Sequence, residues 1–473
     1  MRHRRNFGWD FEVTHERISL WRRLSASQLF VGSFLLLIAA GTVGLKTIPG
    51  LYVDQPLSWI DALFTATSAS CVTGLSVTNA ATTFTFAGQV FLLVLIQCGG
   101  LGVITFTTLL IFALGRRLSL RHEAITASAV EVAPHVDYRR LTRHVIWFTL
   151  AIEAVGAALL YAEWGPRLGW WEGLWPSVFH SISAFCNAGI STFSESMSGE
   201  QSSAASLTVM MTLIAAGGLG FLTLEELALW VRARRRKRPF RISLHSRLAL
   251  VATAILVVGG AGAALLLEWN VSLRGMSPSS KLVNAFFISI SARTAGFNNV
   301  DHAKVTDATN FLTMLLMSIG GSPGSTAGGL KTTTTALLVL LAWSRIGGEK
   351  LVSVWGRSIP PETMQRAVGL AVATMAILIL SVFALVAIET AGISHDQSGD
   401  RFMQYLFEAT SALNTVGLSM GITPRLSNAG KMIAILLMFI GRVGLPTTAA
   451  AFLLAERSPN GDFRFAYEDV AIG

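Results

Sequence analysis

Four short segments of similar residue types recur along the chain, and each is centred on a glycine. In all four, a phenylalanine stands ten positions before the glycine and an apolar residue follows it. The segments are Cys71, Val72, Thr73 and Gly74; Cys186, Asn187, Ala188 and Gly189; Arg293, Thr294, Ala295 and Gly296; and Asn414, Thr415, Val416 and Gly417. Self-similarity of this kind indicates internal repeats.

Glycine in these segments suits the binding of a dehydrated cation by backbone carbonyls. It reaches positive φ at little steric cost, so it can present its carbonyl where a larger residue would clash. Each segment follows an apolar stretch that predicts a helix of about a dozen residues, which is the layout of a pore helix and a selectivity filter. We therefore predict that the four segments form a filter around a bound cation. Any single copy would also fit an ordinary turn between helices.

The composition places the chain in a membrane. Hydrophobic residues make up 52% of the chain and charged residues 14%, whereas soluble domains carry about a quarter charged residues. The net charge of +9 comes from basic clusters between apolar runs, without the interleaved aromatic residues of a base-binding surface, so we expect no nucleic acid partner. The three cysteines, Cys71, Cys98 and Cys186, lie in or beside apolar stretches and indicate no disulfide framework.

Basic residues set the expected orientation. Residues 1–24 carry six arginines, so the positive-inside rule predicts a cytoplasmic N-terminus, with no cleaved signal peptide before the first span. Four repeat units are expected at residues 25–121, 139–238, 245–345 and 362–455, followed by a cytoplasmic C-terminal tail at 456–473.

Each unit is expected to contain an outward span, a re-entrant helix with its filter, and an inward span. A span needs about 20 residues to cross about 30 Å of hydrocarbon, and the stretches before the filters are too short. The inward spans of units two and four are expected over about 205–231 and 431–454. The expected fold is an all-α membrane protein of four tandem membrane-pore-membrane units, with eight transmembrane helices and four re-entrant pore helices around a central pore.

A second glycine repeat lies on the inward span of every unit. Its copies are Gly99–Gly102, Gly217–Gly220, Gly320–Gly324 and Gly441–Gly444. Glycines at these places permit bending or close helix approach beneath the filter, and helix packing alone is the simpler alternative.

The third copy continues as a run that cannot form a stable helix, because Pro323 removes a backbone donor and the glycines lose much backbone entropy on ordering. The run comprises Gly320, Gly321, Ser322, Pro323, Gly324, Ser325, Thr326, Ala327, Gly328 and Gly329. We predict an intramembrane loop that acts as a gate under the filter, with a static packing kink as the alternative. The glycine spacing and the lack of a preceding strand argue against a phosphate-binding loop.

In the fourth copy, Arg442 stands where the other units have Gly100, Gly218 and Gly321. A charge at this depth costs about 2.5 to 3.5 kcal/mol and faces a cavity or a partner. We expect Arg442 to bind carbonyls of the loop 320–329 and to belong to the gate. A purely structural ion pair is the alternative.

Three further charged residues occur in or next to the predicted membrane segments. Glu153, in the outward span of unit two, is expected to pair with a polar group of a pore helix or to be protonated, and a coupling-ion role is a third alternative. Arg293 is expected to point behind its filter, because in the pore it would repel cations, and Glu408 is its expected partner.

These features resemble the Trk/Ktr/HKT superfamily of potassium transporters over nearly the whole chain. The specific marks are the four filter glycines, the broken helix at 320–329 and Arg442. Within the superfamily the chain is most similar to the KtrB membrane subunits, because its basic N-terminus leads directly into the first unit.

The resemblance implies K+ uptake, with K+ at the carbonyls of Gly74, Gly189, Gly296 and Gly417, and often a dependence on Na+. It also implies a homodimer in the bacterial plasma membrane. This dimer would sit on a cytoplasmic, KtrA-like nucleotide-binding ring, and a nucleotide would act only through that ring. Glycine in all four filters favours K+, since a serine in the first filter of this superfamily is associated with Na+ preference.

Two other classes of function have less support. A secondary transporter of another cation or an organic solute also uses broken helices, but on inverted repeats, whereas these units share one orientation. For an intramembrane enzyme we find no Ser/His/Asp set, zinc motif or paired carboxylates at helical spacing. The arginine-rich segments 116–143, 232–241 and 345–366 are expected to bind a soluble regulator or membrane lipid headgroups.

Overall fold

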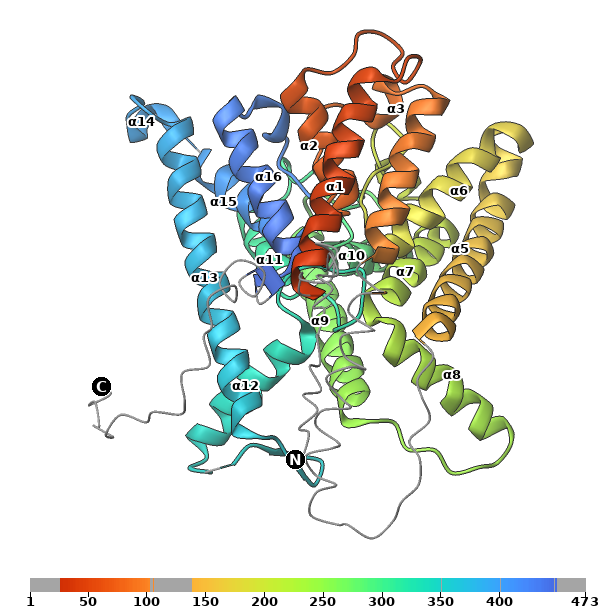
Figure 1. Ribbon diagram of the computed structural model, residues 1–473, viewed down its shortest axis with the longest axis vertical. Helices are drawn as coiled ribbons and strands as arrows, with labels where there is room; N and C mark the ends of the chain where they lie inside the picture. The colour runs from red at the N-terminus through yellow and green to blue at the C-terminus, as the bar shows by residue number, and fades with distance from the viewer. Residues whose placement is uncertain are drawn as a thin grey trace, which may run out of the picture.

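The structure, a computed structural model, describes residues 26–102, 105, 138–349, 351–399, 401–445 and 447–448. In this part of the chain the fold is helical apart from one short hairpin (Figure 1). The expected cytoplasmic ends at 1–24 and 456–473, and most of the arginine-rich segment 116–143, lie outside the described residues.

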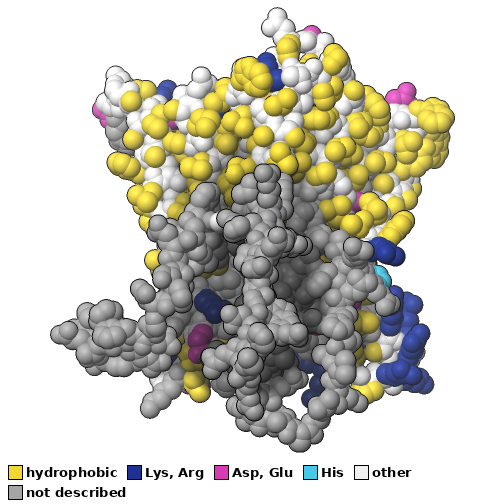
Figure 2. Space-filling model, viewed as in Figure 1, with side chains coloured by type: hydrophobic (Ala, Val, Ile, Leu, Met, Phe, Trp, Pro, Cys, Tyr) yellow, Lys and Arg dark blue, Asp and Glu magenta, His cyan; other side chains and the backbone are white. Residues whose placement is uncertain are grey.

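Four long apolar helices are able to cross a membrane. They are α1 (Ala26–Thr47), α5 (Tyr138–Leu168), α9 (Leu244–Glu268) and α13 (Pro361–Glu389). Large apolar side chains on them face outward, among them Leu36, Ile255 and Phe383 at 71%, 66% and 74% exposure. Hydrophobic side chains also cover the upper part of the face in Figure 2. Helices of this length and surface make the chain a membrane protein.

Each long helix is followed by a shorter one that packs against it. The short helices are α2 (Trp59–Ser70), α6 (Trp170–Cys186), α10 (Pro278–Ala292) and α15 (Arg401–Leu413). Serine caps begin two of them, since the hydroxyls of Ser58 and Ser277 accept the backbone N–H of the residue three positions later. With 12 to 17 residues, these helices are too short to cross about 30 Å of hydrocarbon.

A third set of helices follows the four glycine-centred segments. It consists of Phe86–Gly102, α7 (Ala204–Leu219), α11 (Asp307–Ser318) and α16 (Asn428–Val443). α8 (Phe221–Arg235) follows α7, and α12 (Thr332–Ile346) follows α11. The remaining elements are α3 (Ala80–Thr83), α14 (His395–Ser398), the 3-10 helices η2 (Ser198–Glu200) and η3 (Thr423–Arg425), and an antiparallel hairpin of β1 (Ser353–Val354) and β2 (Arg357–Ser358).

The inward path of unit two, expected over about 205–231, is bent at the second glycine repeat. α7 ends at Leu219, and α8 leaves it at an angle of 106°. Gly220, between them, has φ 79° and ψ 152°, a conformation that only glycine adopts at low cost. The carbonyls of Gly217 and Gly218 accept N–H groups from the distant loop 320–329, so tertiary hydrogen bonds take over where the helical ones end.

The helix α16 ends at Val443, inside the inward span expected over about 431–454. Gly444 follows it with φ 86°, so a glycine again interrupts the helix at the position equivalent to Gly220. The predicted end of this span, at residue 454, lies outside the described residues.

Buried phenylalanines on the four short helices connect the four repeat units to one another in a ring. Phe64 of α2 belongs to an apolar cluster with α15 and α16, and Phe179 of α6 to one with α2 and the helix Phe86–Gly102. Phe287 of α10 lies in a cluster with α6 and α7, and Phe407 of α15 in one with α10 and α11. Each short helix therefore shares an apolar core with helices of the preceding repeat unit, and the short helix of the first unit shares one with the fourth unit.

Candidate cation pathway

The four glycines predicted for the filter lie next to one another in a ring that follows the chain order. All four have positive φ, at 95°, 66°, 78° and 98°. A Cβ added to Gly74, Gly189, Gly296 or Gly417 would lie 3.1, 2.9, 3.2 or 3.0 Å from the Cα of the next glycine in the ring, the last one returning to Gly74. The ring is therefore closed, and it joins residues more than three hundred positions apart in the sequence.

A larger residue would not fit at any of the four positions. An added Cβ would lie within 2.9 Å of the carbonyl oxygen that precedes the next glycine, and these oxygens belong to Ala188, Ala295, Val416 and Thr73. Backbone atoms cannot give way as a flexible side chain can. Glycine is thus required here by both its φ and the close approach of four carbonyl groups.

A second strained residue repeats in all four segments. Val72, Asn187, Thr294 and Thr415, each two positions before the glycine, have φ of 54°, 58°, 66° and 47°. Positive φ is rare for residues other than glycine and is costly for a β-branched one. Left-handed residues therefore alternate with ordinary ones along each segment. We read this alternation as the way in which successive carbonyls are turned to the same side.

Serines of the short helices hold these loops in place. The Ser68 and Ser411 hydroxyls accept the N–H of Gly74 and Gly417 at 3.1 and 3.0 Å. Ser183 instead donates to the carbonyl of Ile190, the residue after Gly189, at 2.7 Å. The third segment has no serine six positions before its glycine, and there Ser291, one position later, donates to the Phe297 carbonyl at 2.6 Å.

Three threonines of the filter offer further oxygen atoms. The hydroxyls of Thr73, Thr294 and Thr415 are buried, and within the described residues none of them has a hydrogen-bond partner. Buried hydroxyls normally find a partner in the protein, in water or in an ion. Their oxygens therefore fit the neighbourhood of a cation.

The loop 320–329 lies directly against the predicted filter segments. A Cβ on Gly328 would lie 2.6 Å from the Asn414 carbonyl oxygen, and one on Gly320 would lie 3.5 Å from the Thr294 methyl carbon. The loop is also anchored to the second segment, where the Thr326 hydroxyl donates to the Phe185 carbonyl at 3.1 Å. As predicted from its composition, it is not helical.

Three cationic side chains donate to carbonyls of this loop. Arg442, 5% exposed, donates from Nη1 to Thr326 and from Nη2 to Gly99, the latter at 3.1 Å, so it bridges the loop to the helix Phe86–Gly102. Arg293 Nη2 donates to Gly320 at 3.1 Å, and Lys331 Nζ donates to Ala327 at 2.6 Å. The loop is therefore held by charge-assisted hydrogen bonds at its first residue and at the adjacent residues Thr326 and Ala327.

The structure changes the expected partner of Arg293. Glu408 accepts hydrogen bonds from the hydroxyls of Ser419 and Thr423, both in its own segment, and it does not pair with Arg293. These two hydroxyls satisfy the carboxylate locally, which leaves the guanidinium to the Gly320 carbonyl. Sequence reasoning also missed Lys331, because nothing in its immediate surroundings distinguishes it from a topology signal.

Glu153 lies beside the end of the short helix α6, but its shorter hydrogen bond is to the helix Phe86–Gly102. Its carboxylate accepts from Gln97 Nε2 at 3.0 Å and lies 3.9 Å from the Cys186 thiol, while the Ser181 hydroxyl donates to its backbone carbonyl. The cysteines Cys71, Cys98 and Cys186 are free. Among the described residues no group of His, Cys, Asp and Glu side chains could hold a transition metal.

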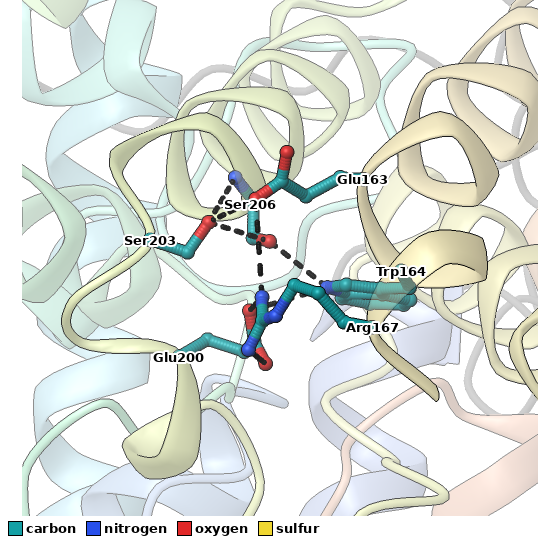
Figure 3. A network of polar contacts seen from close by, with 6 residues as sticks. All are labelled: Glu163, Trp164, Arg167, Glu200, Ser203 and Ser206. Carbon is teal, nitrogen blue, oxygen red and sulfur yellow. Dashed lines mark hydrogen bonds and ion pairs between the residues drawn. The ribbon is translucent and has the colours of Figure 1, made fainter. Parts of the chain in front are cut away.

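A polar network fixes the outer connection of the second segment (Figure 3). Arg167 of α5 makes two hydrogen bonds to the Glu200 carboxylate, at 2.9 and 3.1 Å, and Trp164 Nε1 donates to the same carboxylate at 3.2 Å. Ser203 and Ser206 complete the network at the start of α7, where Ser203 caps the helix. The contacts join α5, η2 and α7 around the loop that follows Gly189.

Replacing Glu200 with glutamine is expected to destabilise the protein by about 1 to 2 kcal/mol, because it removes charge-assisted hydrogen bonds to a partly buried acceptor. Thermal unfolding of the purified protein in detergent measures the effect. Asp301→Asn is the control, since the Asp301–Lys304 pair spans 3.3 Å between side chains that are 51% and 81% exposed and should contribute little. Equal melting temperatures for both variants would contradict a stabilising role of the network.

Several proteins are similar to this chain over nearly its whole length. The potassium/sodium uptake protein NtpJ of Enterococcus hirae is 35% identical over 96% of this chain and 98% of its own length. The Ktr system potassium uptake protein B of Bacillus subtilis is 35% identical over 94% of this chain and 98% of that protein, and its namesake in Vibrio alginolyticus is 37% identical over 90% of both. The crystal structure of the potassium transporter TrkH from Vibrio parahaemolyticus shows the same fold, with a TM-score of 0.70 and 18% identity over 93% of this chain and 86% of that one.

The chain therefore belongs to the class of membrane proteins that transport cations, and it is not an enzyme. The family model for TrkH, described as a cation transport protein, matches residues 23–460, which is most of the chain. The protein belongs to this family. The resemblance to Trk and KtrB proteins that the sequence indicated is confirmed.

Proposed function

We propose that the protein takes up K+ across the cell membrane through a pore at the ring of filter glycines. The observation that carries the proposal is the closed ring of Gly74, Gly189, Gly296 and Gly417, in which the carbonyl oxygen before each glycine lies close to the neighbouring glycine. Carbonyl oxygens in such a ring replace the hydration shell of an alkali cation. The relatives named for potassium uptake support K+ as the transported ion, and the name of the Enterococcus hirae protein supports Na+ as a second transported or coupled ion.

The proposed pore is formed by four membrane-pore-membrane units of one chain, at residues 25–121, 139–238, 245–345 and 362–455. The recurring order of a long helix, a short buried helix, a glycine-centred loop and a third helix supports these units. If the third helix of each unit and the helix that follows its break count as one crossing, the chain crosses the membrane eight times. Both termini are then on the cytoplasmic side, as the positive-inside rule predicts.

The loop 320–329 and Arg442 are proposed as the gate of this pore. The loop lies beside Thr294 and Asn414 of the proposed filter, and because it is not helical, several of its carbonyls accept hydrogen bonds from other segments. Arg442 satisfies one of them from a neighbouring segment. Because the bonds join separate segments, a movement of either side opens the contact without unfolding a helix.

The complete assembly is proposed to be a homodimer on a cytoplasmic ring that binds a nucleotide, with uptake dependent on Na+. The term "Ktr system" in the names of two relatives supports a protein that works with other components. Purification of the chain with its cytoplasmic partners by gentle extraction tests this part of the proposal separately from transport.

Expression of the chain in a bacterium that lacks its own K+ uptake systems is the direct test of function. We expect growth at low external K+ to be restored, together with uptake of radioactive rubidium, because Rb+ is close to K+ in size. Uptake of Na+ or of an organic solute without any uptake of K+ or Rb+ would contradict the proposal and favour a different kind of transporter.

A further inference from the structure

The helix α8 is joined to the loop 320–329 at its first residue. Phe221 N–H donates to the Gly324 carbonyl at 3.2 Å, and a Cβ on Gly220 would lie 2.8 Å from the Pro323 carbonyl oxygen. Phe221 and Thr223 are buried, so the first turn of α8 is held in the protein. This end of the helix therefore touches the middle of the loop.

The end of α7 is joined to the same loop. Ser322 N–H donates to the Gly218 carbonyl at 2.8 Å, and Thr326 N–H donates to the Gly217 carbonyl at 3.3 Å. Together with the contacts of Gly220 and Phe221, these bonds fall within five consecutive residues around the break between α7 and α8. A change in the angle at this break must therefore move the loop or break its hydrogen bonds.

The other end of α8 is strongly cationic and exposed. Seven basic side chains face solvent there: Arg232, Arg234, Arg235, Arg236, Lys237, Arg238 and Arg241. In Figure 2, Lys and Arg side chains gather at the lower right, where Figure 1 places α8. None of the ion pairs in the part of the chain that the structure describes includes these residues. Their charge is thus available to an anionic partner.

Apolar side chains lie beside the arginines on the same helix. Leu229 and Val231 are 42% and 40% exposed, and the Arg234 guanidinium lies 5.2 Å from the centre of the Trp230 ring. A helix that combines arginine, tryptophan and exposed aliphatic side chains suits the boundary between lipid headgroups and acyl chains. α8 starts beside the loop and has 15 residues, so it extends about 22 Å from it.

We propose that the arginine end of α8 binds the anionic headgroups of the inner lipid leaflet, and that this binding favours opening of the loop 320–329. The inference rests on the proposed function, because it takes that loop as the gate. Attraction to an anionic surface draws the exposed end of α8 toward the membrane. Since the first turn is held by Phe221 and Thr223, the helix pivots at Gly220, and the bonds from Ser322 and Thr326 to the end of α7 are weakened.

Flux through the purified full chain in lipid vesicles tests the inference. We compare vesicles of phosphatidylcholine with vesicles of phosphatidylcholine and phosphatidylglycerol, and measure rubidium uptake. The anionic vesicles should give about three- to tenfold higher flux at low ionic strength, and salt should reduce the difference because it screens the attraction. The variant R234Q/R235Q/R236Q should lose the difference.

A matched control removes the same number of charges outside the arginine-rich segments. The variant R274Q/R401Q/R425Q changes three exposed arginines, which follow α9, begin α15 and lie in η3, and should keep the response to phosphatidylglycerol. Equal wild-type flux in both lipids, or a response that survives in the α8 variant, would overturn the inference. So would a response that appears only after a soluble cytoplasmic protein is added, since the arginines would then serve a protein partner. Flux no higher than in protein-free vesicles, in either lipid, would instead contradict the proposed transport function.

Discussion

Replacing Gly296 with serine is expected to lower K+ affinity and the preference for K+ over Na+ by about tenfold to a hundredfold. Gly296 has φ 78°, and a Cβ there would overlap the Val416 carbonyl and lie 3.2 Å from the Gly417 Cα. A left-handed conformation costs a larger residue about 1 to 3 kcal/mol, and 1.4 kcal/mol corresponds to a tenfold change in binding. The Val416 carbonyl must move, so the ring no longer fits K+. Rubidium uptake at varied K+ and Na+ concentrations measures both quantities.

A glycine outside the ring provides the control for this substitution. Gly259, in α9, has no atom within 4 Å of an added Cβ, so Gly259→Ser should leave affinity and selectivity unchanged. Serine substitutions at Gly74, Gly189 and Gly417 should act as Gly296→Ser does, because each would displace a carbonyl of the same ring. Unchanged affinity and selectivity in all four folded variants would show that the ring is not the filter.

Replacing Arg442 with alanine is expected to raise ion flux about tenfold or more and to weaken its regulation. Arg442 donates to the carbonyls of Thr326 and Gly99, and both bonds are lost in the variant. A hydrogen bond from a charged group contributes about 1.5 to 3 kcal/mol, so the loop should leave its position far more often. Arg293 still holds the Gly320 carbonyl and Lys331 the Ala327 carbonyl, which should keep the fold intact.

The control for the Arg442 substitution is an arginine of the same repeat unit that makes no contact with the loop 320–329. Arg425, in η3, is exposed, and Arg425→Ala should leave flux unchanged. Deletion of part of 320–329 should raise flux in the same way as Arg442→Ala, because it removes the obstacle itself. If Arg442 were only structural, its loss would instead reduce the yield of folded protein. Wild-type flux in folded variants of both kinds would rule out the gate.

The four glycines of the ring could be found from the sequence because only one residue type fits their backbone. At Gly74 and its three counterparts, positive φ and a neighbouring carbonyl exclude every side chain, so the repeat is visible as a pattern of letters. The equally strained positions of Val72 and Thr294 could not be predicted, since β-branched residues normally avoid positive φ and nothing in their type marks them.

Contacts between distant segments account for the remaining differences. The break at Gly220 depends on N–H groups of Ser322 and Thr326, which lie about a hundred residues away in the chain. The same holds for Arg293, which binds Gly320 rather than Glu408. Glycine content alone permits a bend or close packing, and only the partner segment decides between them.

The position of a heavy monovalent cation tests the central claim most directly. Anomalous diffraction from crystals of the protein grown with Rb+ or Tl+ locates such an ion without reference to any mutation. We predict an anomalous peak on the axis of the ring, in contact with the backbone carbonyls of Gly74, Gly189, Gly296 and Gly417. Peaks confined to other places, such as the carboxylate of Glu153, with none inside the ring, would contradict the account.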